Sequence, residues 1–430
     1  MKKTSRYLLI GLGMLIFFVL APALILYVSG TRVNIDGRDT NSTGILDVKS
    51  SPSGSTVYVN DANKGSTPAT IRFLNQGEYL VKIVRDGYYD WSKRLPVEAG
   101  QVEFAQEGVA AVQLIKKSDP LVIEPKNVSS FLLINNVAWY MQGNDLVAAP
   151  LTNTSTKTVI QNITNTPSGL SMLRDKKHIL IPGKQPVLID TTNNAVTTLP
   201  FEVKSDSQLQ LPSPDVALFN DNNRVYYYNL IAKNTVAVKS GVRAFTMLGN
   251  TAYFAREDGV ISSAVWNGTD FTDEQTISEN LTFDKAEISL IISDRKELFL
   301  DNAGSGFYRV GPTLDKVMPR VDVAQLDPTT NELTLQVSGE LWFYNFLTNK
   351  PQLLTRSTSQ GSSFFIRSNI GYGFVGTATG LEAVEIDSRD KQNRYQLLKD
   401  KQVYEIAMTE DEKTVLALQD GALVMLQIRD

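Results

Sequence analysis

Uncharged residues run without a break from Tyr7 to Gly30. At 24 residues, this run is long enough to cross a hydrocarbon core of about 30 Å as a helix. Tyr7 and Tyr27 lie near its two ends, where aromatic side chains favour the boundary between lipid and water. The pattern therefore predicts one transmembrane helix at the start of the chain.

The charges beside this run predict its orientation. Lys2, Lys3 and Arg6 precede it, and positively charged residues favour the cytoplasmic side of a membrane. A cleaved signal peptide is the alternative, but its apolar region would be only about 7–15 residues long, and Pro22 is unfavourable at the possible cleavage site. We therefore expect residues 1–30 to form a cytoplasmic tip and an uncleaved anchor, with the rest of the chain outside.

Polar residues without periodicity follow at 31–43 and predict a linker. From 44 to 117, short runs of alternating apolar and polar residues are separated by Gly, Pro, Asn and Asp. This spacing predicts a small β-sandwich, with strands expected at residues 45–49, 56–59, 70–74, 78–84, 91–97 and 109–115.

The same segment contains several separate motifs: Pro52-x-Gly54, Val57-Tyr58-Val59, Gly65-x-Thr67-Pro68, Gly77-x-Tyr79, Gly87-Tyr88 and Trp91. Their order and spacing resemble those of the PEGA domain. The resemblance implies a non-catalytic surface module of the kind found in envelope and S-layer-like proteins. Tyr58, Tyr79, Tyr88 and Trp91 could form an aromatic binding face, although such side chains more often pack in the core and across strands.

Residues 118–430 repeat one unit, in which two apolar strands flank a short polar or glycine turn and a polar loop follows. The turns recur about every 40 residues, at 143–144, 183–184, 221–222, 258–259, 305–306, 338–339, 379–380 and 420–421. Short strands at this period predict a β-propeller. The turns favour eight blades, and seven is the alternative because the spacing near residue 305 is irregular. Two stacked β-sandwiches would have less even connections.

This large domain resembles bacterial propellers of the WD-like and Tol-system type, and the resemblance is diffuse and implies the fold alone. Its last hairpin reaches the C-terminus, so no outer strand can follow it there. Leu121–Glu124 lies before the first repeat, between Pro120 and Pro125, and has no other evident partner. We expect it to pair with Ala422–Ile428, because an exposed apolar edge would invite aggregation.

Composition removes several kinds of chemistry. The chain has no cysteine and one histidine, which excludes disulfides, a lipobox anchor, thiolate nucleophiles and zinc sites of the usual type. His178 starts an apolar strand among charges, and we expect it to be exposed or at an edge rather than to be a catalytic base. The acids Asp215, Asp221, Asp258, Asp294 and Asp411 lie in predicted turns, where aspartate commonly caps the backbone.

These observations predict an all-β, single-pass protein of the cell membrane, with its bulk outside the cytoplasm. We expect a non-catalytic propeller that binds an envelope protein, a peptide or a glycan, without a cofactor, a metal or a catalytic residue. The net charge of −4 gives no electrostatic case for nucleic acid. The alternative is a propeller hydrolase or lyase acting on surface glycans or peptides, and acids and arginines clustered at one mouth of the central channel would favour it.

Overall fold

The computed structural model describes residues 11–22, 31–33, 40–163, 169–204, 208–283, 288–302, 305–327, 329–356 and 363–430. Residues 11–22 form a helix, and the described part of the chain contains no helix that is both long and apolar enough to cross a membrane. Residues 7–10 and 23–30 of the predicted span lie outside the described residues.

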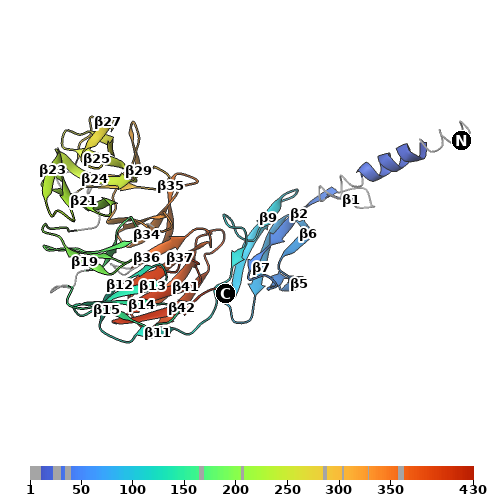
Figure 1. The fold of residues 1–430 in the computed structure, drawn as a ribbon. Helices are drawn as coiled ribbons and strands as arrows, with labels where there is room; N and C mark the ends of the chain where they lie inside the picture. The colour runs from blue at the N-terminus through green and yellow to red at the C-terminus, as the bar shows by residue number, and fades with distance from the viewer. Residues whose placement is uncertain are drawn as a thin grey trace, which may run out of the picture.

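The small domain is a sandwich of two sheets and lies between the N-terminal helix and the large domain (Figure 1). One sheet has the strand order β5-β4-β7-β8, and in the other β2 pairs with β1, β6 and β9. Leu46, Val57, Ile83 and Trp91 are fully buried between them. The strands are β1 (Thr31–Val33), β2 (Thr40–Val48), β3 (Ser50–Ser51), β4 (Thr56–Val59), β5 (Ala62–Ser66), β6 (Ala69–Asn75), β7 (Gly77–Val84), β8 (Trp91–Val97), β9 (Val102–Phe104) and β10 (Val112–Gln113).

The small domain differs from the sequence prediction in several details, and β9 was not among the expected strands. Thr31–Val33 and the start of β2, expected to be linker, pair with each other. Asn60 and Asp61 have positive φ values of 46° and 63° and complete a turn by themselves, so the rest of the expected turn is free to form β5 on the edge of β4. The strand expected at 109–115 shrinks to β10, because the chain then leaves the sandwich and Ile115 packs against the large domain.

The large domain is a β-propeller. Its sheets, here called the ring sheets, each contain four antiparallel strands, and in the described part of the chain there are eight of them. In chain order they are β12 (Val128–Ile134), β13 (Val137–Gln142), β14 (Asp145–Pro150) and β15 (Thr158–Ile160); β16 (Ser171–Met172), β17 (His178–Ile181), β18 (Val187–Asp190) and β19 (Ala195–Thr198); β20 (Leu209–Ser213), β21 (Val216–Asp221), β22 (Arg224–Asn229) and β23 (Thr235–Ser240); β24 (Val242–Leu248), β25 (Thr251–Arg256), β26 (Ile261–Trp266) and β27 (Phe271–Ser278); β28 (Ile288–Ile292), β29 (Leu298–Asn302), β30 (Gly306–Val310) and β31 (Leu314–Met318); β32 (Val323–Leu326), β33 (Leu333–Val337), β34 (Glu340–Asn345) and β35 (Lys350–Arg356); β36 (Phe364–Arg367), β37 (Tyr372–Thr377), β38 (Gly380–Glu385) and β39 (Arg394–Lys399); and β40 (Val403–Met408), β41 (Thr414–Gln419) and β42 (Ala422–Gln427) with β11 (Leu121–Glu124).

Every predicted hairpin turn lies where the second strand of a ring sheet meets the third. Ser338 and Gly339 show why these positions turn: both have positive φ, 48° and 83°, as a two-residue hairpin that matches the twist of its strands requires. Asp420 and Gly421 repeat the arrangement with 48° and 76°. The hairpin predictions are therefore confirmed.

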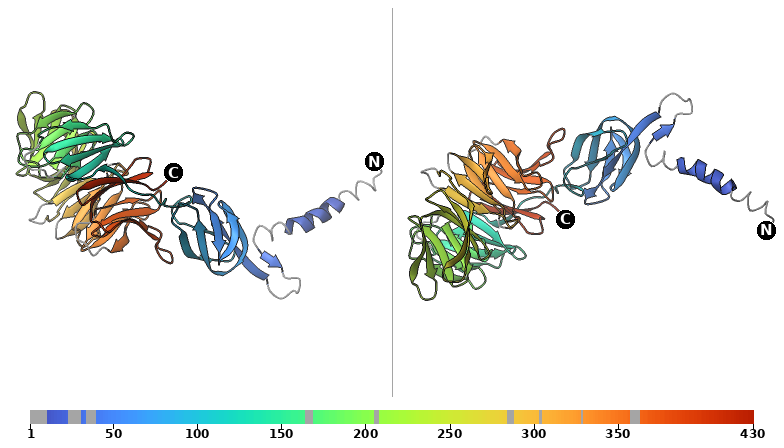
Figure 2. Two further views of the ribbon diagram at one scale, coloured as in Figure 1. Left: turned by 90° about the horizontal axis from the view of Figure 1, so that it is seen from below. Right: turned by 90° about the horizontal axis from the view of Figure 1, so that it is seen from above.

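The predicted closing strand is also confirmed. β11 pairs antiparallel with β42, and Leu121 lies opposite Met425 while Val122 lies opposite Val424. The last ring sheet, in the order β11-β42-β41-β40, thus combines both ends of the large domain. In two further views of the ribbon, the C-terminus lies on the side of the large domain that meets the small domain (Figure 2).

Candidate functional site

The first strand of each ring sheet borders a cavity of about 750 Å³. These inner strands are β12, β16, β20, β24, β28, β32, β36 and β40, and each is the end strand of its sheet. An end strand has one partner only, so its other edge carries backbone groups that the sheet does not use. Because residues from all of these strands contribute to one wall, the ring sheets are arranged around the cavity.

The wall of the cavity combines apolar side chains and polar groups in about equal measure. Each inner strand contributes an aliphatic or aromatic side chain that is only half-buried, and this set consists of Leu132, Met172, Leu211, Leu248, Ile291, Leu326, Phe364 and Ile406. Covering such side chains stabilises a complex by roughly 25 cal/mol per Å² of apolar surface. The wall therefore offers apolar side chains that a ligand can cover, beside polar groups that can form hydrogen bonds with it.

Charged residues gather at the end of the cavity where the inner strands finish. Arg174 follows β16, and its guanidinium donates to the Ile292 carbonyl at 2.5 Å and to Asp294 Oδ1 at 2.8 Å. Asp294 follows β28, which belongs to the third sheet along from that of β16. Arg174 thus crosses this end of the cavity and joins two sheets that are not neighbours.

A second arginine at this end is almost fully buried. Arg367 is 5% exposed, and its Nη1 lies 2.9 Å from Asp327 Oδ2 and 4.0 Å from Glu332 Oε2. Glu332 accepts a hydrogen bond from the Ser368 backbone N–H at 2.7 Å. Burial raises the pKa of the Glu332 carboxyl above its usual value, although Ser368 and the Arg367 charge oppose the shift. Both arginines are therefore balanced by acids within the same end of the cavity.

His178 differs from its prediction. It is 9% exposed, and its Nδ1 lies 2.5 Å from Asp175 Oδ2. The other oxygen of Asp175 accepts hydrogen bonds from the Lys177 and His178 backbone N–H groups. Burial opposes ionisation of Asp175, but these hydrogen bonds hold its pKa below the usual value. The expectation of an exposed or edge histidine was wrong, because the turn before β17 places Asp175 against the imidazole of His178.

The predicted turn acids are dispersed. Asp215, Asp221 and Asp258 are exposed, and Asp411 accepts a hydrogen bond from Thr409 Oγ1 at 2.6 Å within its own turn. Of this set, Asp294 alone contributes to the cavity among the described residues. Arg174, Asp327, Glu332 and Arg367 also line the cavity and were not predicted as site residues. The available signal was their common position at the end of an inner strand or in the first polar turn that follows it.

The aromatic residues of the small domain do not form a shared exposed face. Trp91 is fully buried and Tyr88 is 5% exposed, and both belong to the sandwich core. Tyr58 and Tyr79 are half-buried. For Trp91 and Tyr88, the packing alternative is therefore confirmed.

Comparison with solved structures finds similar chains of low sequence identity. The C-terminal WD40 domain of Sif2 covers 75% of this chain and 100% of its own length at 12% identity and a TM-score of 0.48. The computationally designed Ika8 protein covers 70% of this chain and 96% of its own, at 12% identity and a TM-score of 0.47. BamB from Moraxella catarrhalis covers 73% of this chain and 99% of its own, at 10% identity and a TM-score of 0.45.

No curated protein sequence matches the chain. The PEGA domain family matches residues 43–106, which are the part of the small domain that carries the motifs named above. The chain therefore joins a segment that matches the PEGA domain family to a β-propeller.

Proposed function

We propose that the chain is a membrane-anchored protein of the cell envelope whose propeller binds a partner at the cavity without catalysing a reaction. In this proposal residues 1–30 hold the chain in the membrane with the N-terminus in the cytoplasm. The small domain is a spacer or adaptor, and the ring sheets of the described chain are eight blades of one propeller. The partner is another envelope protein, a peptide or a glycan.

The observation that carries the proposal is the set of half-buried apolar side chains that the inner strands contribute to the cavity wall. Side chains such as Leu248 and Ile291 are half-buried in a concave surface, which is where the strongest contributions to binding occur once water is excluded. The two arginines at the end of the cavity are paired with acids, Arg174 with Asp294 and Arg367 with Asp327. This arrangement favours recognition through apolar groups over acid–base chemistry.

A charge placed in the wall tests the proposal. In Ile291→Lys, a buried ammonium without a partner would weaken binding about tenfold or more. Leu347→Lys is the matched control, because Leu347 lies in the turn between β34 and β35 and is 87% exposed. Each variant would be solubilised from membranes, and its bound partners would be quantified after cross-linking. Equal partner recovery by both variants, with both folded, would place binding elsewhere.

One observation favours the enzyme alternative. Glu332, with its pKa raised by burial, lies beside Arg367 at the charged end of the cavity, and a general acid needs a raised pKa. The measurement that separates the two functions is release of sugars or peptides from envelope material by the wild type and by Glu332→Gln. Release that disappears in the variant would establish an enzyme, and no release by either protein supports binding.

A further inference from the structure

The contact between the small domain and the large domain is built around a buried ion-pair cluster. We propose that this cluster locks the two domains into one unit, so that the charged end of the cavity always lies on the small-domain side and the other end always faces away. The proposal concerns an intramolecular interface and holds whether or not the chain is anchored in a membrane.

Lys93 is the centre of the cluster. It lies in β8 of the small domain with no exposed surface, and its Nζ lies 3.0 Å from Glu385 Oε2 of the large domain. The same Nζ donates to the Asp387 carbonyl at 2.7 Å. A buried ammonium is tolerated only when it is paired and hydrogen-bonded. Because these partners of Lys93 all belong to the large domain, the small domain alone does not satisfy its charge.

Glu385 is bound from both domains. Trp91 Nε1 of the small domain donates to Glu385 Oε1 at 2.9 Å, and Asn393 Nδ2 of the large domain donates to Oε2 at 2.7 Å. Glu385 itself has no exposed surface. The carboxylate therefore has hydrogen-bond partners on both oxygens, and its geometry depends on both domains being in contact.

Arg389 extends the cluster towards the rim. It forms an ion pair with Asp387 at 2.6 Å and another with Glu103 of the small domain. The turn that holds Arg389 also occurs in the neighbouring sheet, where Asn345 Oδ1 accepts the Leu347 N–H at 2.9 Å, as Asp387 Oδ1 accepts the Arg389 N–H at 3.0 Å. In the neighbouring sheet the residue that corresponds to Arg389 is Leu347, and its side chain is exposed to solvent. The turn between β38 and β39 is thus specialised for contact with the small domain.

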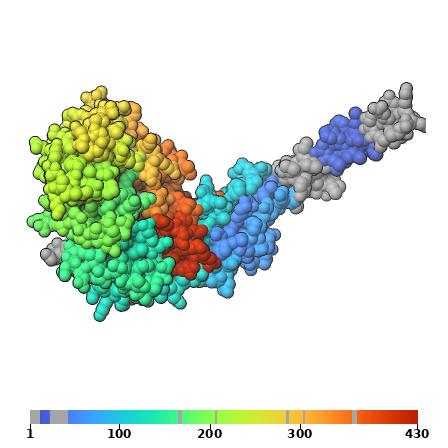
Figure 3. Space-filling view, viewed as in Figure 1, coloured from blue at the N-terminus to red at the C-terminus, as the bar shows by residue number. Residues whose placement is uncertain are grey.

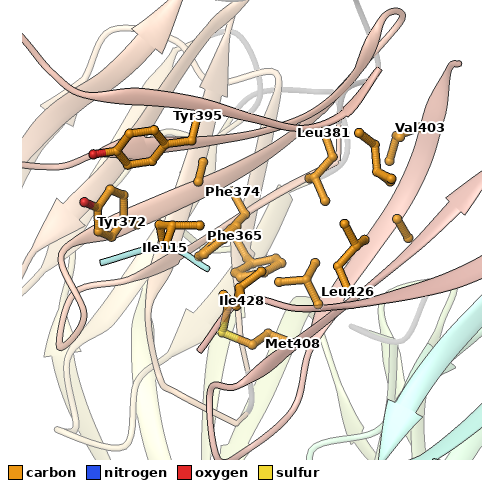
Figure 4. Packing of buried hydrophobic residues seen from close by; sticks show 14 of the residues in the cluster. Ile115, Phe365, Tyr372, Phe374, Leu381, Tyr395, Val403, Met408, Leu426 and Ile428 are labelled. Atoms are coloured by element: carbon orange, nitrogen blue, oxygen red, sulfur yellow. The ribbon is translucent and has the colours of Figure 1, made fainter. Parts of the chain in front are cut away.

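Apolar groups flank the charges. Ile115, at the end of the small domain, is fully buried in a cluster that includes Phe374 and Ile428 (Figure 4). The rings of Tyr89 and Tyr395 are stacked with centroids 5.1 Å apart. The chain that joins the two domains is therefore itself part of the packed interface, and the space-filling view shows the C-terminal residues in red directly against the small domain (Figure 3).

The position of these contacts fixes the orientation of the cavity. The small domain meets the turn between β36 and β37, where a Cβ on Gly371 would lie 2.3 Å from Gln106 Nε2. It also meets the turn between β38 and β39 and the end of β42, as the pairing of Lys116 with Asp430 shows. In antiparallel four-stranded sheets, all three sites lie at the end where the inner strand finishes. Arg174 crosses the cavity at this same end.

The test uses the full chain, which contains no cysteine and so accepts two introduced labels cleanly. Spin labels on Glu78→Cys and Lys350→Cys, both exposed and one in each domain, report the distance between the domains by pulsed electron paramagnetic resonance. We expect one narrow distance peak in the otherwise wild-type chain. A broad distribution there would overturn the proposal.

Variants of Lys93 then test whether its ion pairs hold the two domains in one arrangement. Lys93→Met should broaden the distance peak and lower the Tm, whereas Lys93→Met with Glu385→Gln, which removes both charges, should restore much of the narrow peak. Lys82→Met is the control, because Lys82 forms an exposed ion pair with Asp90 at 2.8 Å on the same domain. If Lys93→Met does not fold, Arg389→Met at the rim takes its place. Distributions identical to that of Lys82→Met would refute the lock.

Discussion

At the scale of single residues, Glu405 in β40 links the folded state to pH. Its carboxylate accepts hydrogen bonds from Ser130 Oγ at 2.8 Å and from the Phe131 N–H at 2.7 Å. Burial raises the pKa of Glu405 above its usual value, although these bonds oppose the shift. A carboxyl with a raised folded pKa stabilises the fold below its unfolded pKa of about 4.3, and this stability is lost as the pH rises through the folded pKa.

We therefore expect Glu405→Gln to gain stability relative to the wild type as the pH rises. Glutamine does not titrate, and it can still accept from Phe131 and donate to Ser130. The difference in Tm between the variant and the wild type, measured by calorimetry from pH 4 to pH 8, should increase in favour of the variant. Glu78→Gln, at an exposed position, is the control and should show a constant difference. A constant difference for Glu405→Gln as well would contradict the prediction.

Single-residue roles were the least predictable part of the site. Turn chemistry is local, so Asp294 and Asp411 could be placed in turns from their neighbours alone. The partner of Asp294 could not be named, because Arg174 is 120 residues away in the chain and meets it only when the ring closes. Trp91 and Glu385 are 294 residues apart, and no sequence pattern predicted the hydrogen bond between them.

At the scale of elements, the pairing of β11 with β42 predicts how a C-terminal truncation affects stability. Deleting residues 424–430 removes the partners of Leu121 and Val122 together with the buried Val424, Leu426 and Ile428. Losing several buried aliphatic side chains should destabilise the whole large domain by about 4 kcal/mol or more. The measurement is urea unfolding followed by tryptophan fluorescence.

Deleting only residues 429–430 is the control for this truncation. It removes the ion pair between Lys116 and Asp430, the ion pair between Arg429 and Glu412, and the hydrogen bond that Tyr88 donates to Asp430. It keeps every strand of the last ring sheet, so the main unfolding transition should stay close to that of the full chain. A truncation at 424 that frays one edge and leaves the main unfolding transition in place would show that the last sheet is not needed to close the ring.

Strands could be predicted where the residue pattern was local, or where a sheet lacked an outer strand that had to come from elsewhere in the chain. The hairpins followed from turn residues such as Asp420-Gly421, and β11 followed from the absence of an outer strand after the last hairpin. β5 was not predicted, because Ala62–Ser66 is polar and exposed and lacks the alternation of a half-buried strand. The ends of the small domain were also misjudged, since pairing with β2 turned Thr31–Val33 from linker into strand.

At the scale of the whole molecule, the charge pattern at the N-terminus predicts topology. Lys2, Lys3 and Arg6 should stay in the cytoplasm, with residues 31–430 outside. Protease added to intact cells, or to cells with a permeabilised outer layer where one is present, should digest the large domain and spare a tag at the N-terminus. Complete protection of the large domain, with digestion after lysis as the control, would reject this orientation.

Ring closure by strands from both ends also determines the order in which the chain can fold. β11 ends at Glu124 and its partner β42 begins at Ala422, so about 300 residues must be made between them. At about 5–20 residues per second, synthesis takes roughly 15 to 60 s over that stretch. During this interval Leu121 and Val122 have no partner strand, because their partner β42 has not yet been synthesised. A nascent chain therefore exposes the free edge of β11 until β42 has been made, and such an edge can pair with another chain.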